Sequence, residues 1–184
     1  MPENVTFANR YGLNVQVYAY GTDLSATGED AVAPLLTIDF ANTCEADISG
    51  DRVWATGGQG HVNRVAFNDP IQGTFRISTQ LMTAKLLNLM AGNDIAQENT
   101  ADEIIFQNTA NGTPVYYMVV ATTVWQGEDK KSYAETLTFH KVCPRRALNI
   151  SYSGEGDPTS VDVEFDVLED PNTHKVLTIK KVAN

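Results

Sequence analysis

The sequence predicts a mainly β protein in which two antiparallel sheets pack as a sandwich or barrel, with one flanking helix and one long polar arm. Apolar and polar residues alternate in several short segments, which is typical of half-buried strands. Turn signals separate these segments at short, even intervals, as in an antiparallel sandwich or barrel. The apolar period changes to that of a helix in only one segment of the chain. We expect the whole chain, 1–184, to form one domain.

Strands are predicted wherever the alternation or a β-branched run is clear. The segments are 13–20, 36–41, 73–78, 103–108, 115–125, 133–142, 148–152, 161–167 and 176–182. The longest β-branched and aromatic run is 115–125, so we expect it to be a central strand. In 161–167, four apolar residues alternate strictly with acidic and hydroxyl residues, which predicts one buried face and one solvated face.

The single helix is expected over about 79–91. Four apolar residues recur there at helical spacing and form one stripe for the core: Met82, Leu86, Leu89 and Met90. Ser78 or Thr79 is positioned to cap the start of this helix, and Gly92 to close its end in the left-handed conformation. Leu81 falls off the stripe and therefore predicts a contact with a second surface.

The arm covers about 42–70 and is mostly polar. Three glycines in four residues at its centre, Gly57, Gly58 and Gly60, permit a tight chain reversal. We therefore predict a hairpin with a glycine tip. A polar arm of this length cannot fill a core of its own, so it is either mobile or ordered by another chain. A phosphate-binding loop is a weak interpretation because no Gly-Lys-Ser/Thr follows the glycines.

The overall charge and composition limit the class of protein. The net charge is −10 and the pI about 4.6, which argues against a protein that binds nucleic acid through Lys and Arg. A solvated acidic surface is the plain explanation for that charge. No apolar run approaches the roughly 20 residues that span a membrane. The N-terminal residues lack the basic and apolar regions of a signal peptide, so we expect no Sec export and no membrane partner.

The chain shows no motif for catalysis, a metal or a cofactor. The three histidines are far apart in sequence, and none has a ligand partner at zinc spacing. Asp162, Glu164 and Asp166 share one strand face and could chelate calcium or form an acid/base pair, but a solvated face is the better interpretation. No Gly-x-Ser-x-Gly sequence indicates a nucleophile. We therefore expect a protein that is not an enzyme.

The two cysteines, Cys44 and Cys143, are isolated in the sequence. Two cysteines form no metal or redox motif, although their spacing leaves a disulfide open. Two buried free thiols are the expected arrangement, since free cysteine is among the most buried residue types.

The order of these features resembles that of bacteriophage major tail tube proteins, from about Val15 onward. In the first half, the resemblance lies in Glu45-Ala46-Asp47, Gly57-Gly58-Gln59-Gly60, Phe67-Asn68-Asp69-Pro70, Gly73-Thr74-Phe75-Arg76-Ile77 and the short Leu-rich helix. In the second half, it lies in the strand at 115–125, the break at Pro144, the turn at 153–158 and the strand ending Phe165-Asp166-Val167-Leu168. The family is related in fold to the tubes of tailocins and of type VI secretion.

This resemblance implies a structural protein of the virion tail, assembled in the host cytoplasm. Six copies form a ring whose inner sheets join into one closed barrel, and the rings stack into a hollow tube. Double-stranded DNA passes through the tube without specific binding. The other implied partners are the tape measure and tail terminator proteins and, in contractile tails, a sheath protein.

In this family, a long early loop or hairpin contacts adjacent subunits and rings. The resemblance and the residue pattern together give a set of expected interface residues, Leu81 among them because it lies off the helical stripe: Trp54, Ala55, Thr56, Gly57, Gly58, Gln59, Gly60 and Leu81.

An acidic channel wall would repel DNA phosphates and let the genome pass, which would give the charge balance a function. The candidates for that wall alternate with apolar residues and must face away from the core: Asp39, Asp162, Glu164 and Asp166. The outer surface of the tube is the rival location for the last three.

A β-sandwich module that binds a carbohydrate or another ligand is the alternative function. The aromatic residues Trp54, Tyr18 and Tyr20 would then form its binding platform. Electron microscopy separates the two hypotheses, because only the first predicts rings or tubes.

Overall fold

The computed structural model describes residues 7–25, 31–56, 63–80, 82–96, 104, 106, 113–128, 130–148 and 160–183. These residues form nine strands and one helix: β1 (Phe7–Ala19), β2 (Leu36–Ser49), β3 (Arg52–Thr56), β4 (Asn63–Asn68), β5 (Gln72–Thr79), α1 (Ala84–Ala91), β6 (Tyr117–Gly127), β7 (Ser132–Pro144), β8 (Val161–Leu168) and β9 (Leu177–Ala183). Every strand pair is antiparallel. The prediction of a mainly β, antiparallel fold with one helix is confirmed.

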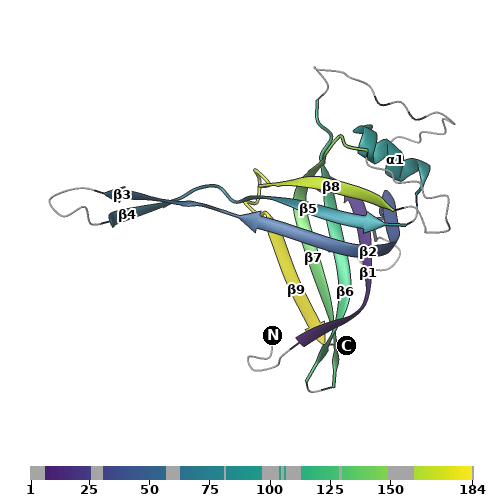
Figure 1. Cartoon of the computed structure of the whole chain (residues 1–184), viewed down its shortest axis with the longest axis horizontal. Helices are drawn as coiled ribbons and strands as arrows, with labels where there is room; N and C mark the ends of the chain where they lie inside the picture. Colours follow the sequence, from purple (N-terminus) through teal and green to yellow (C-terminus); the bar gives the residue numbers. More distant parts are fainter. Residues whose placement is uncertain are drawn as a thin grey trace.

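Seven of the strands form one sheet that closes on itself. Its order is β6-β1-β2-β5-β8-β7-β9, and β6 also pairs with β7, so six strands complete a ring and β9 is attached outside it. The layer of β2, β5 and β8 crosses over the layer of β1, β6, β7 and β9 (Figure 1). The sheet turns between layers at β7, whose residues 133–139 pair with β9 and whose residues 141–144 pair with β8.

The core fills the space between these two layers. Phe75 of β5 is fully buried. The centre of its ring lies 4.3 Å from the ring centre of Phe139 on β7 and 6.2 Å from that of Phe165 on β8. Burial alternates strictly along β8, as the sequence predicts. β6 pairs with β1 on one edge and with β7 on the other, which confirms it as a central strand.

The helix packs its apolar stripe into this core from one end of the sheet. Leu86, Leu89 and Met90 are buried with the core residues, as predicted. Gly92 has φ +79° and closes the helix in the left-handed conformation, as also predicted. Leu81, for which a contact with a second surface was predicted, lies outside the described residues.

The predicted start of the helix is wrong. Thr79 belongs to β5, where it pairs with Val161, and α1 begins at Ala84 with Thr83 as its N-cap. The Thr83 hydroxyl accepts a hydrogen bond from the Leu86 amide at 3.2 Å. Met82 therefore precedes the helix and is not part of its apolar stripe. It is 37 % exposed, so its predicted place in the core is wrong.

Two predicted strands do not form in the described residues. Ile104 and Phe106 are in no strand, and the other residues of 103–108 lie outside the description. Leu148 is also in no strand and is 46 % exposed, because the chain leaves the sheet after Pro144. The rest of that predicted strand, after Leu148, is not described.

Candidate assembly surfaces

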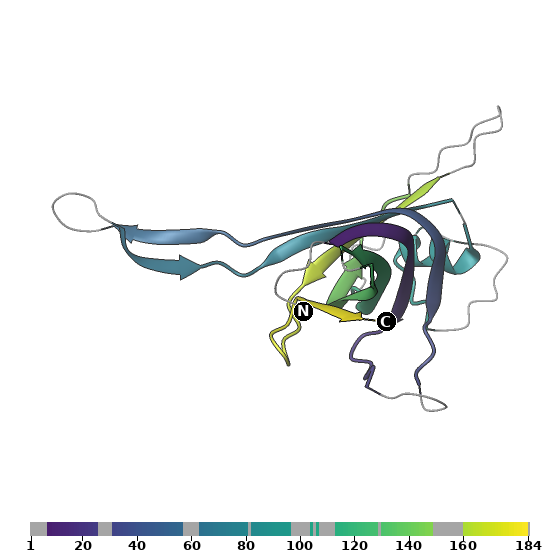
Figure 2. The same cartoon turned by 90° about the horizontal axis from the view of Figure 1, so that it is seen from below.

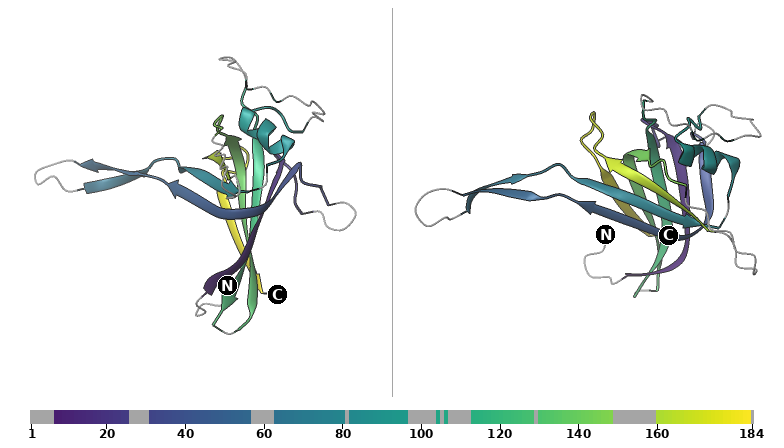
Figure 3. Two further views of the ribbon diagram at one scale, coloured as in Figure 1. Left: turned by 45° about the vertical axis from the view of Figure 1, so that its right-hand side comes forward. Right: turned by 45° about the horizontal axis from the view of Figure 1, so that its top comes forward.

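The predicted arm is a long hairpin that extends away from the body of the molecule, and three further views agree on this (Figures 1, 2 and 3). Its inner part continues β2 and β5, which pair as far as Ser49 and Gln72. Its outer part is a separate two-stranded sheet of β3 and β4. Between the two parts, the Asp69 amide donates to the Asp51 carbonyl at 2.8 Å. The hairpin that the sequence predicts is therefore present.

Gly73 sets how closely the two strands approach at the base of the arm. A Cβ atom at this position would lie 2.2 Å from the backbone oxygen of Asp47 and 2.9 Å from the Cα of Ile48. Both are backbone atoms of β2, so no side-chain movement would relieve the overlap. The glycine thus lets β5 pair with β2 where the arm leaves the body.

The structure describes only some of the predicted interface residues. Trp54, Ala55 and Thr56 lie in β3, with Trp54 paired to Ala66 and Ala55 to Val65. Gly57, Gly58, Gln59, Gly60 and Leu81 lie outside the described residues. No described residue between 50 and 70 belongs to the hydrophobic core.

The acidic stripe, defined as Asp162, Glu164 and Asp166, lies on the solvent side of β8, because the residues between them are buried. Arginines flank it. Arg145 Nε lies 2.7 Å from Asp166 Oδ1 and its Nη1 2.5 Å from Glu164 Oε1, while Arg76 Nη2 lies 3.9 Å from Asp162 Oδ2. The hydrogen bond to Asp166 raises the pKa of Arg145. The stripe is therefore partly neutralised.

The stripe continues across the neighbouring strands as rows of facing residues. Glu164 pairs with Arg76, which pairs with Glu45 of β2, and Asp166 pairs with Thr74, which pairs with Asp47. Facing residues share one side of a sheet, so among the described side chains the outer face of β2, β5 and β8 carries five carboxylates and Arg76, and Arg145, which follows β7, adds a second arginine. The remaining candidate, Asp39, lies in β2, but its side chain is not described.

The two arginines of this face were not found from the sequence. Arg76 alternates with Phe75 and Ile77, so its outward direction was predictable. Its carboxylate partner was not, because that depends on β5 lying beside β8. Arg145 follows Pro144 and meets the stripe only because the end of β7 pairs with β8.

β9 and the outer part of β2 each leave one strand edge open in the described part of the fold. β9 pairs with β7 and with no other described strand. β2 leaves β1 at Ala41, so the side of residues 42–49 away from β5 has no described partner strand. We call this side the β2 edge. On β9, Ile179 is 52 % exposed and Val182 is 47 % exposed.

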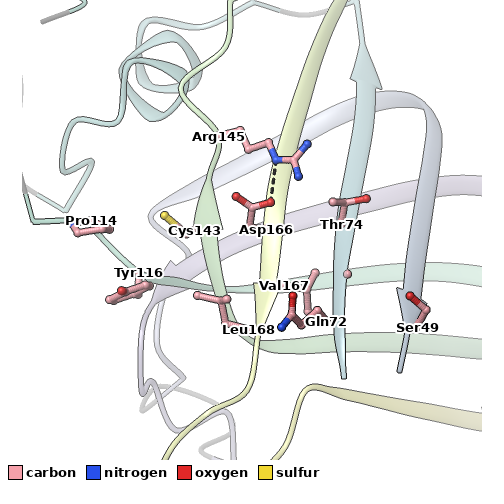
Figure 4. A pocket seen from close by; sticks show the side chains of 11 residues that line it. Ser49, Gln72, Thr74, Pro114, Tyr116, Cys143, Arg145, Asp166, Val167 and Leu168 are labelled. Carbon is pink, nitrogen blue, oxygen red and sulfur yellow. Dashed lines mark hydrogen bonds and ion pairs between the residues drawn. The ribbon is translucent and has the colours of Figure 1, made fainter. Parts of the chain in front are cut away.

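A cavity of about 510 Å³ lies where the end of β7 meets β8 and the base of the arm (Figure 4). Arg145 and Asp166 are among the residues that line it, and their charged groups already form an ion pair with each other. Cys143 lines the cavity, and burial raises the pKa of its thiol, which keeps it protonated and a poor nucleophile. Among the described residues, no cluster of three His, Cys, Asp or Glu could hold a metal ion.

Both cysteines are free. Cys143 is half-buried, but Cys44 is exposed, so the expectation of two buried thiols is wrong for Cys44. Cys44 faces Ile77 of β5 on the inner side of the sheet, at a place where β2 has no strand beyond it. Although the residue is exposed, neighbouring protein atoms desolvate its thiol, and this raises the pKa of Cys44 to about 12.

The tyrosines of the alternative hypothesis do not form an open platform. Tyr18 is only 8 % exposed. Tyr20 packs edge-to-face with Tyr116, ring centres 6.4 Å apart, and the Lys141 ammonium lies 4.3 Å from the Tyr116 ring centre and 5.7 Å from that of Tyr20. Their faces are thus occupied by a cation of the same chain.

Asp170 anchors the turn between β8 and β9 to the end of β1. Tyr20 and Thr173 each donate a hydroxyl hydrogen bond of 2.6 Å to its carboxylate, and the Asn172 amide donates another of 3.1 Å. These bonds, Thr173 first, lower the pKa of Asp170 to about 2. The carboxylate therefore stabilises the fold above its ordinary pKa near 4, and this contribution is lost as the pH falls through about 2.

Replacing Asp170 by Asn should therefore lower the free energy of unfolding at pH 7, and the difference from the wild type should shrink between pH 4 and 2. The amide keeps the shape of the side chain but cannot carry the charge that the three donors stabilise. Urea denaturation at several pH values measures both quantities. Asp51→Asn, at an exposed position between β2 and β3, is the matched control. A difference that stays constant down to pH 2 would contradict the assignment.

No protein-family model matches this sequence, and a search of curated proteins gives no match. In the described part of the chain, no helix has the length and apolar character needed to cross a membrane.

Proposed function

We propose that this chain is a structural protein that assembles with copies of itself into rings and stacked tubes, as bacteriophage tail tube proteins do. The observation that carries the proposal is the arm. A two-stranded hairpin is at best marginally stable in water by itself, and β3 and β4 pair with no third described strand. An arm of this kind gains its stability from a surface supplied by another molecule.

Repeated copies of the same chain are the partner that best fits the rest of the molecule. The β2 edge and the edge of β9 are different surfaces, so a contact between them is heterologous and repeats from copy to copy. Such contacts close into a ring or continue as a filament. The arm then reaches a neighbour in the same ring or in the next one. Six copies per ring is the number that the family resemblance implies.

The acidic outer face of β2, β5 and β8 fits the wall of a channel for double-stranded DNA. Five carboxylates against two arginines leave this face negative, so it would repel phosphates rather than bind them. In this proposal, the acidic stripe lies on the channel wall, the chain performs no catalysis, and tape measure and tail terminator proteins meet the assembled tube. A sheath is a further partner if the tail is contractile. The place of action is the virion tail, after assembly in the host cytoplasm.

Negative-stain electron microscopy of the purified protein over a range of concentrations tests the proposal. Rings or tubes that become more abundant as the concentration rises are the expected result. A compact monomer at every concentration would overturn it, and binding of that monomer to a glycan would favour the alternative module. A high-resolution structure of a ring would locate the acidic stripe, and a channel wall dominated by Lys and Arg would contradict the role proposed for it.

A further inference from the structure

We propose that β9 of one copy pairs with the β2 edge of a second copy, so that the two chains share one continuous sheet. The inference rests on the proposed function in that it requires copies of the chain to associate. It goes further by naming the two strands that form the joint and the side chains that match them.

Both strands have unused backbone hydrogen-bonding groups in the described structure. β9 uses one of its edges on β7, and β2 at residues 42–49 uses one of its edges on β5. An open strand edge is a template for pairing with another chain. The exposed Ile179 and Val182 mean that β9 lacks cover on both of its faces as well.

The outward faces of the two strands carry opposite charges. Lys180 is exposed on β9, and Glu45 and Asp47 are exposed on β2. None of these three residues takes part in an ion pair within the described part of the chain. Pairing of the strands with their outward faces together places the lysine beside the two carboxylates, and opposite charges on facing strands stabilise a sheet.

The inward faces match in a different way. Ile179 lies on the side of β9 that faces the core layer, beside Lys181, which pairs with the buried Glu135 at 3.3 Å. On β2, Cys44 and Ala46 are exposed on the side that they share with the buried core of β5. Successive residues of a strand point to opposite sides, so the alignment that joins the charges also joins these exposed apolar groups.

The N-terminal part of β1 offers another edge, but it lacks this complementarity. Residues 7–12 pair with β6 and with no other described strand. They include Arg10 and no Asp or Glu, so Lys180 would meet no opposite charge there. The β2 edge is therefore the better partner for β9.

A disulfide between copies tests the joint on its inward side. Ile179→Cys in a Cys143→Ser background places one new thiol on β9 and retains the native Cys44 on the β2 edge. Oxidation of assembled protein with a copper catalyst at alkaline pH, chosen because desolvation raises the pKa of the Cys44 thiol, should give a ladder of covalent dimers, trimers and larger species on a non-reducing gel. Thr178→Cys, one residue away on the opposite face, is the matched control and should crosslink at least several-fold less. Removing Cys44 as well should abolish the ladder.

Charge reversal tests the outward side. Lys180→Glu should raise the protein concentration needed for half-assembly by about tenfold, because an opposite-charge pair on facing strands becomes a like-charge pair. Adding Glu45→Lys and Asp47→Lys should restore assembly. Lys130→Glu makes the same charge change in the exposed β6–β7 turn and should assemble like the wild type. Circular dichroism checks that each variant is folded.

The outcomes separate this joint from the general function. If the wild type forms rings, Lys180→Glu behaves like Lys130→Glu and no ladder appears, the joint is wrong and the proposed function stands. If the wild type never assembles and no ladder forms, both fail. A ladder with Thr178→Cys but not with Ile179→Cys would overturn the proposed facing of the two strands.

Discussion

A chain that lacks Ala55–Gly60 is expected to remain a folded monomer and to form no tubes. The deletion removes the end of β3 and the glycine-rich centre of the arm. The core lies between the two layers of the closed sheet and receives no described residue from 50–70, so the body should keep its stability. Assembly should fail because the shortened arm no longer reaches the neighbouring copy.

Size-exclusion chromatography, circular dichroism and negative-stain imaging together measure these two results. A variant in which the same six residues are replaced by an equally long Gly-Ser segment is the matched control. It keeps the reach of the arm and removes its side chains, so it separates length from specific contact. Normal tubes made by the deleted chain would contradict the role of the arm.

The strands were predictable where one face of the sheet is covered by the core. β8 is the clearest example, since the alternation of Val161, Val163, Phe165 and Val167 with polar residues matches its alternating burial. The full length of β2 was not predictable in this way. Its residues after Ala41 have no strand beyond them on one side, so Cys44 and Ala46 stay exposed and the sequence shows no apolar alternation. Backbone pairing with β5, rather than burial, extends this strand.

The helix shows a second limit of sequence reasoning. Thr79 and Thr83 are both good caps, and the apolar spacing fits a start at either residue. The choice is made by β5, which keeps Thr79 fully buried as the partner of Val161. Because of this tertiary contact, the helix begins about one turn later in the sequence than predicted, and Met82 lies outside it.

The sequence was enough to predict that the residues of the candidate surfaces point outward, but not which residues they contact. Alternation was enough to turn the acidic stripe toward solvent, whereas its pairing with Arg145 depends on the β7–β8 corner. The open edge of β9 depends likewise on strand order. Its two adjacent lysines, Lys180 and Lys181, are the one sequence signal, because lysine is common on edge strands.

Phe75→Ala is expected to lower the free energy of unfolding by about 3–5 kcal/mol, as truncation of a buried Phe usually does. Phe75 is fully buried, and its ring packs on Phe139 of the other layer and beside Phe165 of its own layer. Alanine would leave a cavity that strands fixed on both sides cannot close, because β5 is hydrogen-bonded to both β2 and β8.

Urea denaturation of the monomer under non-assembling conditions measures this loss. Phe75→Leu should cost clearly less, since it keeps most of the buried volume. Thr74→Ala, one residue away on the solvent side, should change the stability by less than about 0.5 kcal/mol, as is usual for surface positions. If Phe75→Ala is no more damaging than Thr74→Ala, the two layers do not depend on this aromatic contact. Their attachment would then have to come from the β1–β2 and β7–β8 corners alone, where backbone pairing carries the sheet from one layer to the other.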